Sequence, residues 1–262
     1  MSPAPATASA EQIRDVNTRY HDGAAADYDA KWGITFDDLG TSMVRAKLEK
    51  AIGGPLPALG RTLELGAGTG YVTLNLLRAG LIDEATCTDI APGMIAALER
   101  NAGALGLPVT TAVCDAEELP FEDGSFDVVL GHAVLHHLPD LDQTWREIRR
   151  VLRPGGMAVF AGEPSARGDR IARIPKTVGW RLSPLWRRAL RAGEAEAGHL
   201  DGGAENHEME LFVDVHAFTP DQLSRPAKAA GFGDVHVVGE ELLANWFGWT
   251  NRALESTADP AT

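Results

Sequence analysis

Cysteine is scarce in this chain of 262 residues, which has only Cys87 and Cys114. Two cysteines cannot form the disulfide framework of a small secreted domain. Both lie in segments that we expect to be core strands, and we therefore interpret them as buried apolar thiols.

Long apolar runs and basic residues are also few. No stretch approaches the roughly 20 apolar residues that span a membrane, and the first ten residues have neither the basic segment nor the apolar run of a secretory signal. These absences predict a cytoplasmic protein without a transmembrane segment. The 24 basic residues stand against 37 acidic ones, giving a formal net charge of −13. Because nucleic-acid binding depends on basic surface, we expect no nucleic-acid partner.

Glycine, by contrast, is concentrated in one short segment. Residues 63–70 have the sequence Leu-Glu-Leu-Gly-Ala-Gly-Thr-Gly, which predicts a buried strand, a loop that approaches a ligand, and a helix from about Tyr71 with free N–H groups at its start. A dinucleotide-binding loop would need glycine at position 71, and a P-loop would need Gly-Lys-Ser/Thr. The segment therefore predicts a nucleotide-like ligand outside these two classes.

Acidic residues follow the next two predicted strands. Residues 84–90 form one such strand, with Asp89 near its end, and residues 108–114 form another, followed by Asp115. In β-α-β nucleotide sites, an acid at the end of the second strand accepts hydrogen bonds from the ribose hydroxyls. Asp115 is placed to accept from an adenine amino group. A single aspartate after a strand is usually a turn cap, but the three signals in this order predict a nucleoside site.

This combination resembles the class I S-adenosylmethionine-dependent methyltransferases over about residues 61–163. The matching segments are the cofactor loop 64–70, the ribose acid Asp89, the adenine turn 114–116, the fourth strand 126–132 and the turn 152–156 into the fifth strand. Residues 135–140, Leu-His-His-Leu-Pro-Asp, are most similar to members that act on small molecules such as sugars, quinones or lipids. The resemblance implies S-adenosylmethionine as cofactor and methyl transfer to a small-molecule acceptor. Four of the six tryptophans lie beyond Glu163, and we expect the acceptor to be apolar or amphiphilic.

The same resemblance implies a set of cofactor-binding residues. They are Tyr28, Glu64, Gly66, Ala67, Gly68, Gly70, Asp89, Ile90, Met94, Cys114, Asp115, Ala116, Gly131 and His132. Tyr28 lies in an Asp-Tyr-Asp context and resembles a residue that closes over the cofactor. Simple aromatic packing is an equally good interpretation of Tyr28.

Catalytic candidates follow the predicted fourth strand. A hydroxyl or acidic-carbon acceptor needs its proton removed, and His136 and His137 lie where open α/β sheets bind ligands. Glu163, at the end of the fifth strand, could orient an imidazole, and we select His136 with Glu163. Packing of both histidines is the alternative. His132 and His136 are four residues apart without a third ligand, so we expect no metal site. The Asp/Asn-Pro-Pro-Tyr sequence of many amino-group and nucleobase methyltransferases is absent, which favours an oxygen or carbon acceptor.

Alternating strands and helices predict an α/β fold, a Rossmann-like, doubly wound and mostly parallel sheet with helices on both faces. We divide the single domain into a disordered tail (1–10) and helical cover within 1–60, a cofactor-binding core at 61–163, a substrate-specificity insertion at 164–218, and a helix-strand-helix at 219–262. Family members have a seventh, antiparallel strand. No β-rich run follows Gly239, so we expect either that this strand is missing or that the chain lacks a C-terminal portion.

The two C-terminal parts carry further expectations. Residues 167–191 hold eight basic side chains and one acid, whereas 193–214 hold seven acids and no lysine or arginine. A basic amphipathic helix at 184–192 could cover the acceptor or touch a membrane, although a solvated face paired with the acidic half is favoured. We expect a helix that starts at Thr219 and that Pro226 breaks or kinks early. A strand at 234–239 and a helix at 240–255 should follow.

One alternative function remains open from the sequence. The cofactor motifs predict binding only, so a protein that binds S-adenosylmethionine or S-adenosylhomocysteine without transfer, acting as a regulator or partner, fits them equally well.

Overall fold

The computed structural model describes residues 9–168, 170, 185 and 216–239. Its elements, in chain order, are α1 (Ala10–Ala24), α2 (Tyr28–Trp32), α3 (Asp38–Ile52), β1 (Arg61–Leu65), α4 (Tyr71–Arg78), β2 (Glu84–Asp89), α5 (Pro92–Leu105), β3 (Thr110–Val113), β4 (Phe126–His132), the 3₁₀ turn η1 (Leu135–His137), α6 (Leu141–Val151), β5 (Leu152–Ala161) and α9 (Pro220–Ala229). The predicted basic helix at 184–192, apart from Leu185, and the helix at 240–255 lie outside the described residues.

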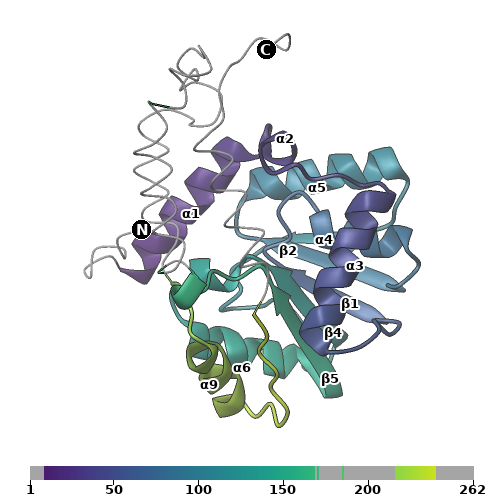
Figure 1. Ribbon diagram of the computed structural model, residues 1–262. Helices are drawn as coiled ribbons and strands as arrows, with labels where there is room; N and C mark the ends of the chain where they lie inside the picture. Colours follow the sequence, from purple (N-terminus) through teal and green to yellow (C-terminus); the bar gives the residue numbers. More distant parts are fainter. Residues whose placement is uncertain (1–8, 169, 171–184, 186–215, 240–262) are drawn as a thin grey trace.

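The five strands form one parallel sheet in the order β3-β2-β1-β4-β5 (Figure 1). Leu63 in β1 is paired with Thr86 in β2 on one side and with Val129 in β4 on the other. The chain thus reverses its direction of winding between β1 and β4, which is the switch point at which open α/β sheets bind ligands beyond the carboxyl ends of the strands. The predicted Rossmann-like, doubly wound parallel sheet is confirmed.

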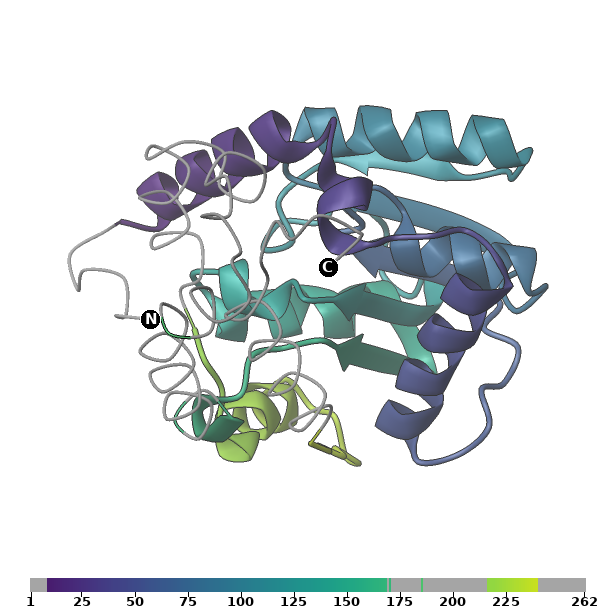
Figure 2. The ribbon, with the colours of Figure 1, turned by 45° about the horizontal axis from the view of Figure 1, so that its top comes forward.

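Helices cover both faces of this sheet. On one face α3 and α4 bury Val44, Leu48 and Leu76 against β4 and β5. On the other face α6 and α9 bury apolar side chains that include Trp145 and Ala227. Burial of Trp145 confirms that its indole is part of the core. Figures 1 and 2 show that α1 belongs to neither of these layers. One end of α1 lies beside α5, and the helix extends from there away from the sheet.

The start of α1 corrects one boundary of the predicted tail. Ser9 caps the helix: its hydroxyl accepts from the Gln12 N–H at 3.2 Å, and its own N–H donates to the Gln12 side chain at 2.8 Å. This Ser-x-x-Gln capping box fixes the first turn. Residues 9 and 10 are therefore ordered, and only residues 1–8 of the predicted tail lie outside the described part of the chain.

The structure contradicts the strand predicted at 234–239 and a break at Pro226. Residues 234–239 form no strand and pair with none of the five described strands. Pro226 does not break α9, which continues to Ala229. Its missing N–H removes one hydrogen bond, and burial of Pro226 and Ala227 in the face packed on α6 holds the helix together.

Among the described helices, none is long and apolar enough to cross a membrane. The boundaries that we assign to the four segments of the domain stay predictions.

Candidate active site

A pocket opens at the carboxyl ends of β1 to β4, beneath α1 and α2. The empty space within it, with the open mouth counted, is about 740 Å³. Ten of the predicted cofactor residues line it, namely Tyr28, Gly66, Gly68, Asp89, Ile90, Met94, Cys114, Asp115, Ala116 and His132. The structure thus brings together residues from five separate segments.

The glycine loop after β1 is shaped by positive backbone angles. Gly66 has φ of +59° and Gly68 has φ of +53°, conformations that side-chain-bearing residues rarely adopt. A Cβ on Gly66 would lie 2.4 Å from a methyl group of Val134, whereas a Cβ on Gly68 would enter open space. The loop therefore leaves backbone exposed along the pocket, as a close-fitting ligand requires.

The four remaining predicted cofactor residues do not line the pocket but lie next to residues that do. Glu64 is 2 % exposed and its carboxylate accepts the Thr73 N–H at 3.1 Å, which fixes the first turn of α4. Burial raises the pKa of Glu64 to about 8. Gly70 caps α4, and on Gly131 a Cβ would lie 2.7 Å from Val134. Ala67 is buried in the turn between β1 and α4.

Asp89 lies at the end of β2 with both oxygens held. Its Oδ1 accepts the Ala91 N–H and its Oδ2 the Gly68 N–H, each at 2.9 Å. Burial raises the pKa of Asp89 to about 6, although the two hydrogen bonds favour the charged form. A carboxylate has about four acceptor sites, so Asp89 retains capacity for two donors from a ligand in the pocket.

Asp115, after β3, joins an ion-pair cluster that includes α1. Arg14 Nε lies 2.5 Å from Asp115 Oδ2, and Arg14 Nη2 pairs with the buried carboxylate of Glu117. Asp115 Oδ1 also accepts the Glu117 N–H at 2.9 Å. The other Glu117 oxygen accepts the Asp140 N–H at 2.8 Å. The cluster thereby joins the loop after β3, the start of α6 and the cover helix α1.

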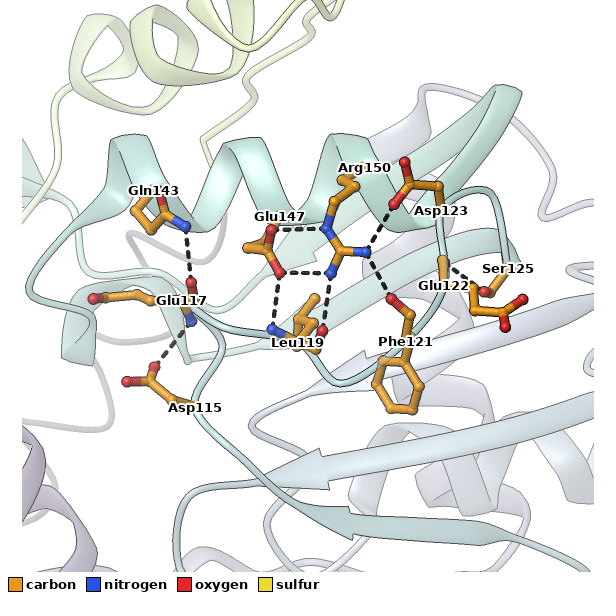
Figure 3. A network of polar contacts seen from close by, with 10 residues as sticks. All are labelled: Asp115, Glu117, Leu119, Phe121, Glu122, Asp123, Ser125, Gln143, Glu147 and Arg150. Atoms are coloured by element: carbon orange, nitrogen blue, oxygen red, sulfur yellow. Dashed lines mark hydrogen bonds and ion pairs between the residues drawn. The ribbon is translucent and has the colours of Figure 1, made fainter.

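A second network holds the loop that follows Asp115 against α6 (Figure 3). The Gln143 side chain donates to the Glu117 carbonyl at 3.0 Å. The Arg150 guanidinium donates to the carbonyls of Leu119 and Phe121 at 2.9 and 2.6 Å. These bonds pair the backbone carbonyls of a segment that has no regular secondary structure. They thereby fix the position of Asp115, at the start of that segment.

The cover is tied to the cofactor loop through α2. Asp29 accepts from the Thr69 hydroxyl at 2.5 Å and from the Asn101 amide at 3.0 Å. Asp22, at the end of α1, accepts the Gly93 N–H at 2.6 Å. These anchors place Tyr28 in the pocket wall, where burial and the nearby Asp89 raise its pKa to about 12.

The two histidines of η1 occupy different positions. His136 is 8 % exposed, with its Nδ1 2.9 Å from Glu163 Oε2. His137 lines the pocket, its ring centroid 3.8 Å from that of His136 and 5.3 Å from that of His21. Of the selected pair His136 and Glu163, neither lines the pocket, and His137 is the η1 imidazole that does.

Glu163 has a structural task in this turn. Its Oε1 accepts the N–H groups of Val134 and Leu135, each at 3.0 Å, and its Oε2 accepts the His136 N–H at 3.1 Å. Ala133 has φ of +54°, the only positive value at a non-glycine residue in the described part of the chain. Such backbone costs energy, and Glu163 holds the strained turn in place.

The cysteines differ from the sequence prediction at one position. Cys87 is fully buried, as expected. Cys114 is only half-buried and lines the pocket, because the chain leaves β3 at Val113 and turns toward the ligand space. Desolvation raises the pKa of the Cys114 thiol to about 11, so it is an uncharged wall residue.

Sequence reasoning predicted a helical cover but missed the residues of α1 that line the pocket. Arg14, Asn17 and His21 line the pocket from three successive turns of that helix. The Ser-x-x-Gln capping box could have located the start of α1. No local pattern indicates which face of α1 covers the sheet.

These residues fit an adenosyl cofactor. The exposed glycine backbone leaves room that a Cβ would fill, and two acids stand at neighbouring strand ends, where a nucleoside offers hydroxyl and amino donors. In the described part of the chain, no group of three or more His, Cys, Asp or Glu side chains is arranged to hold a metal ion.

Comparison with known proteins agrees with this geometry. Residues 63–160 match the model of a methyltransferase domain. The chain is 36 % identical over 246 residues to malonyl-[acyl-carrier protein] O-methyltransferase of Geobacter sulfurreducens, covering 88 % of this chain and 85 % of that protein. It is 39 % identical over 173 residues to demethylmenaquinone methyltransferase of Thermus thermophilus, covering 66 % of this chain and 74 % of that protein.

Solved structures show the same fold at lower identity. Phosphoethanolamine N-methyltransferase 2 of Haemonchus contortus, in complex with S-adenosylmethionine, is 20 % identical with a TM-score of 0.63, over 94 % of this chain and 51 % of that one. The [4+2]-cyclase SpnF is 20 % identical with a TM-score of 0.61, over 96 % of this chain and 83 % of that one. With the identity to the Geobacter enzyme over most of both chains, the chain belongs to the class I S-adenosylmethionine-dependent methyltransferases and has S-adenosylmethionine as its cofactor.

Proposed function

We propose that this enzyme transfers the methyl group to an oxygen or carbon atom of a small, apolar or amphiphilic acceptor. The observation that carries this proposal is the imidazole of His137 in the pocket wall, backed by His136 and Glu163. An oxygen or acidic-carbon acceptor must lose a proton, and imidazole is suited to take it near neutral pH.

The relatives support the same chemistry. One is named an O-methyltransferase of malonyl-[acyl-carrier protein]. Another, of Desulfotalea psychrophila, is named a ubiquinone/menaquinone biosynthesis C-methyltransferase and is 28 % identical over 69 % of this chain and 68 % of that protein. Oxygen and carbon acceptors are thus both found among similar proteins.

Each part of the site has a separate task in this proposal. Bound S-adenosylmethionine supplies an activated methyl group. Asp89 and the glycine loop bind and orient the nucleoside, and Tyr28 covers it and limits access of water. His137 receives the acceptor proton, while the His136–Glu163 pair positions the turn that carries it. Alignment of this kind contributes about 7 to 11 kcal/mol to methyl transfer.

The charge distribution supports a small acceptor over a nucleic acid. The net charge is −13. Arg14 is the sole lysine or arginine among the described residues that line the pocket, and it is paired with Asp115 and Glu117. We place acceptor selection in the insertion at 164–218, with direct membrane contact through residues 184–192 as a less favoured role.

Turnover with labelled cofactor tests the function directly. The protein is incubated with S-[methyl-³H]adenosylmethionine and separate sets of phenols, quinols, sugars, fatty acids, malonyl thioesters and amines. We expect labelled product in at least one O- or C-acceptor set. Labelled amines alone would contradict the proposed acceptor class, and cofactor binding without product from any set would favour a binding protein that lacks transfer.

The role of His137 predicts a separation of turnover from binding. His137→Ala is expected to lower kcat by about 10² to 10⁴, the usual effect of a general base, with less than about threefold change in S-adenosylhomocysteine affinity. His236→Ala, at an exposed position outside the pocket, is the control. A His137→Ala enzyme with wild-type kcat would leave His137 as a packing residue.

The raised pKa of Asp89 predicts pH-dependent cofactor binding. Ribose hydroxyls donate better to a carboxylate than to a carboxylic acid, so S-adenosylhomocysteine should bind best above pH 6. Affinity should fall as the pH drops through about 6, toward tenfold per pH unit at the limit. Calorimetry between pH 5 and 8 measures this. Asp89→Asn should remove the dependence due to this carboxylate, and an identical pH profile in wild type and Asp89→Asn would assign it to another group.

A further inference from the structure

Asn17, on α1, carries a buried hydrogen-bond acceptor. Its side chain lines the pocket and the residue is 4 % exposed. The amide Nδ2 donates to the carbonyls of Ile13 and His137, at 3.1 and 3.3 Å. A flipped amide would set its oxygen against these two carbonyl oxygens, so the hydrogen bonds fix the orientation.

The remaining atom, Asn17 Oδ1, has no hydrogen-bond partner in the structure. Leaving a buried acceptor unsatisfied costs about 1–3 kcal/mol, and native proteins seldom do so. Because Asn17 belongs to the pocket wall, an N–H or O–H group of a bound molecule can satisfy Oδ1. The atom therefore indicates a ligand contact.

The neighbours of Asn17 indicate which donor this is. Arg14 lies three residues earlier, and residues at this spacing are adjacent on a helix surface. Arg14 is ion-paired with Asp115, the acid that the sequence predicts beside the adenine amino group. Asn17 therefore lies about one helical turn from Arg14, the residue paired with Asp115 at the adenine end of the pocket.

An adenine 6-amino group also has two N–H donors to place. Because the two N–H bonds of an amino group diverge, Asp115 takes one of them, beside the Glu117 N–H on its Oδ1 and Arg14 at its Oδ2. The second N–H needs another acceptor in the same wall. Asn17 Oδ1 is buried, oriented and without a partner there.

We propose that Asn17 Oδ1 accepts a hydrogen bond from the 6-amino group of the bound cofactor, so that α1 takes part in selecting adenine. A 6-oxo base would place one acceptor against another, and the site would reject it. The proposal rests on the adenine position at Asp115 and is independent of the methyl acceptor.

Calorimetry with two cofactor products tests this contact. S-adenosylhomocysteine has the 6-amino group, whereas S-inosylhomocysteine has an oxygen there. We expect wild type to prefer the adenosyl compound, and Asn17→Leu to reduce the ratio of the two affinities by about tenfold, the value of one hydrogen bond. Thr18→Ala, on the same helix outside the pocket, should leave the ratio unchanged.

The ratio of the two affinities separates recognition of the adenine amino group from a structural role of Asn17. Loss of the Asn17 bond to the His137 carbonyl weakens both compounds equally and cancels in the ratio. An unchanged ratio in Asn17→Leu would overturn the proposal and leave Asn17 as a tie between α1 and η1. If Asn17→Leu does not fold, Asn17→Ala serves the same comparison. Neither measurement uses an acceptor, so failure here is distinct from failure to find methyl transfer.

Discussion

Asp89→Ala is expected to weaken S-adenosylhomocysteine binding by roughly 10² to 10⁴. Hydrogen bonds to a charged group contribute about 1.5–3 kcal/mol each, and two ribose hydroxyls would lose their acceptor. The substitution also removes the partner of the Gly68 N–H, which is bonded to Asp89 at 2.9 Å. Both effects act on cofactor binding, and titration calorimetry at pH 7.5 measures their sum.

Two variants separate the ribose contact from a general effect of charge. Asp89→Asn keeps one acceptor oxygen and should bind with intermediate affinity. Asp83→Ala removes an exposed acid just before β2, at the opposite end of that strand, and should bind as wild type does. Unchanged affinity in Asp89→Ala would reject the ribose role.

The stability of Asp89→Ala is expected to change much less than its affinity. Burial raises the pKa of Asp89 to about 6, so the folded protein holds the ionised carboxylate at pH 7 at a cost. Removing the side chain relieves this cost and offsets the two lost backbone hydrogen bonds. A carboxylate kept ionised against its environment is typical of a functional group.

Glu163→Ala should have the largest effect on stability. The carboxylate accepts three backbone N–H groups of one turn and the imidazole of His136, with 6 % of the side chain exposed. Without it, buried donors lose their partner beside the strained Ala133. We expect a loss of about 3–5 kcal/mol and a fall in Tm of roughly 10 °C, measured by thermal unfolding.

A graded series tests whether the carboxylate itself matters. Glu163→Gln keeps one acceptor oxygen but turns an NH₂ group toward part of the turn, and should lie between wild type and Glu163→Ala. Glu118→Ala, at an exposed position, should unfold as wild type does. If Glu163→Ala unfolds at the wild-type temperature, the turn is held by other contacts.

The cofactor loop and its acids could be predicted because their signals are local. Glycine spacing in 63–70 dictates which backbone angles are available, and apolar runs followed by Asp89 and Asp115 place each acid at the end of a strand. Parallel strands end at one edge of a sheet, so these local signals converge without knowledge of other contacts.

The cover could not be predicted in the same way. Arg14 is 103 residues from Glu117, and Asn17 is 120 residues from His137, although each pair is in contact. Such contacts depend on the path of α1 beyond the strand ends. The spacing of apolar and polar residues within α1 does not indicate where the helix lies relative to the sheet.

The η1 turn illustrates the limit at a single residue. The sequence places His136 and His137 together after β4, but successive residues of a 3₁₀ turn point about 120° apart. Glu163 fixes the turn so that His136 points toward the carboxylate and His137 toward the pocket. The choice between the two imidazoles is therefore a tertiary one.

The sequence by itself determined the parallel sheet, the cofactor loop and the acids at the strand ends, because backbone conformation and the alternation of strands with helices follow from local residue types. Only the tertiary structure decided the orphan acceptor of Asn17, the inward face of His137 and the irregular path of 234–239. Each of these depends on a partner far away in the chain, or on its absence among the described strands, and local sequence carries no information about either.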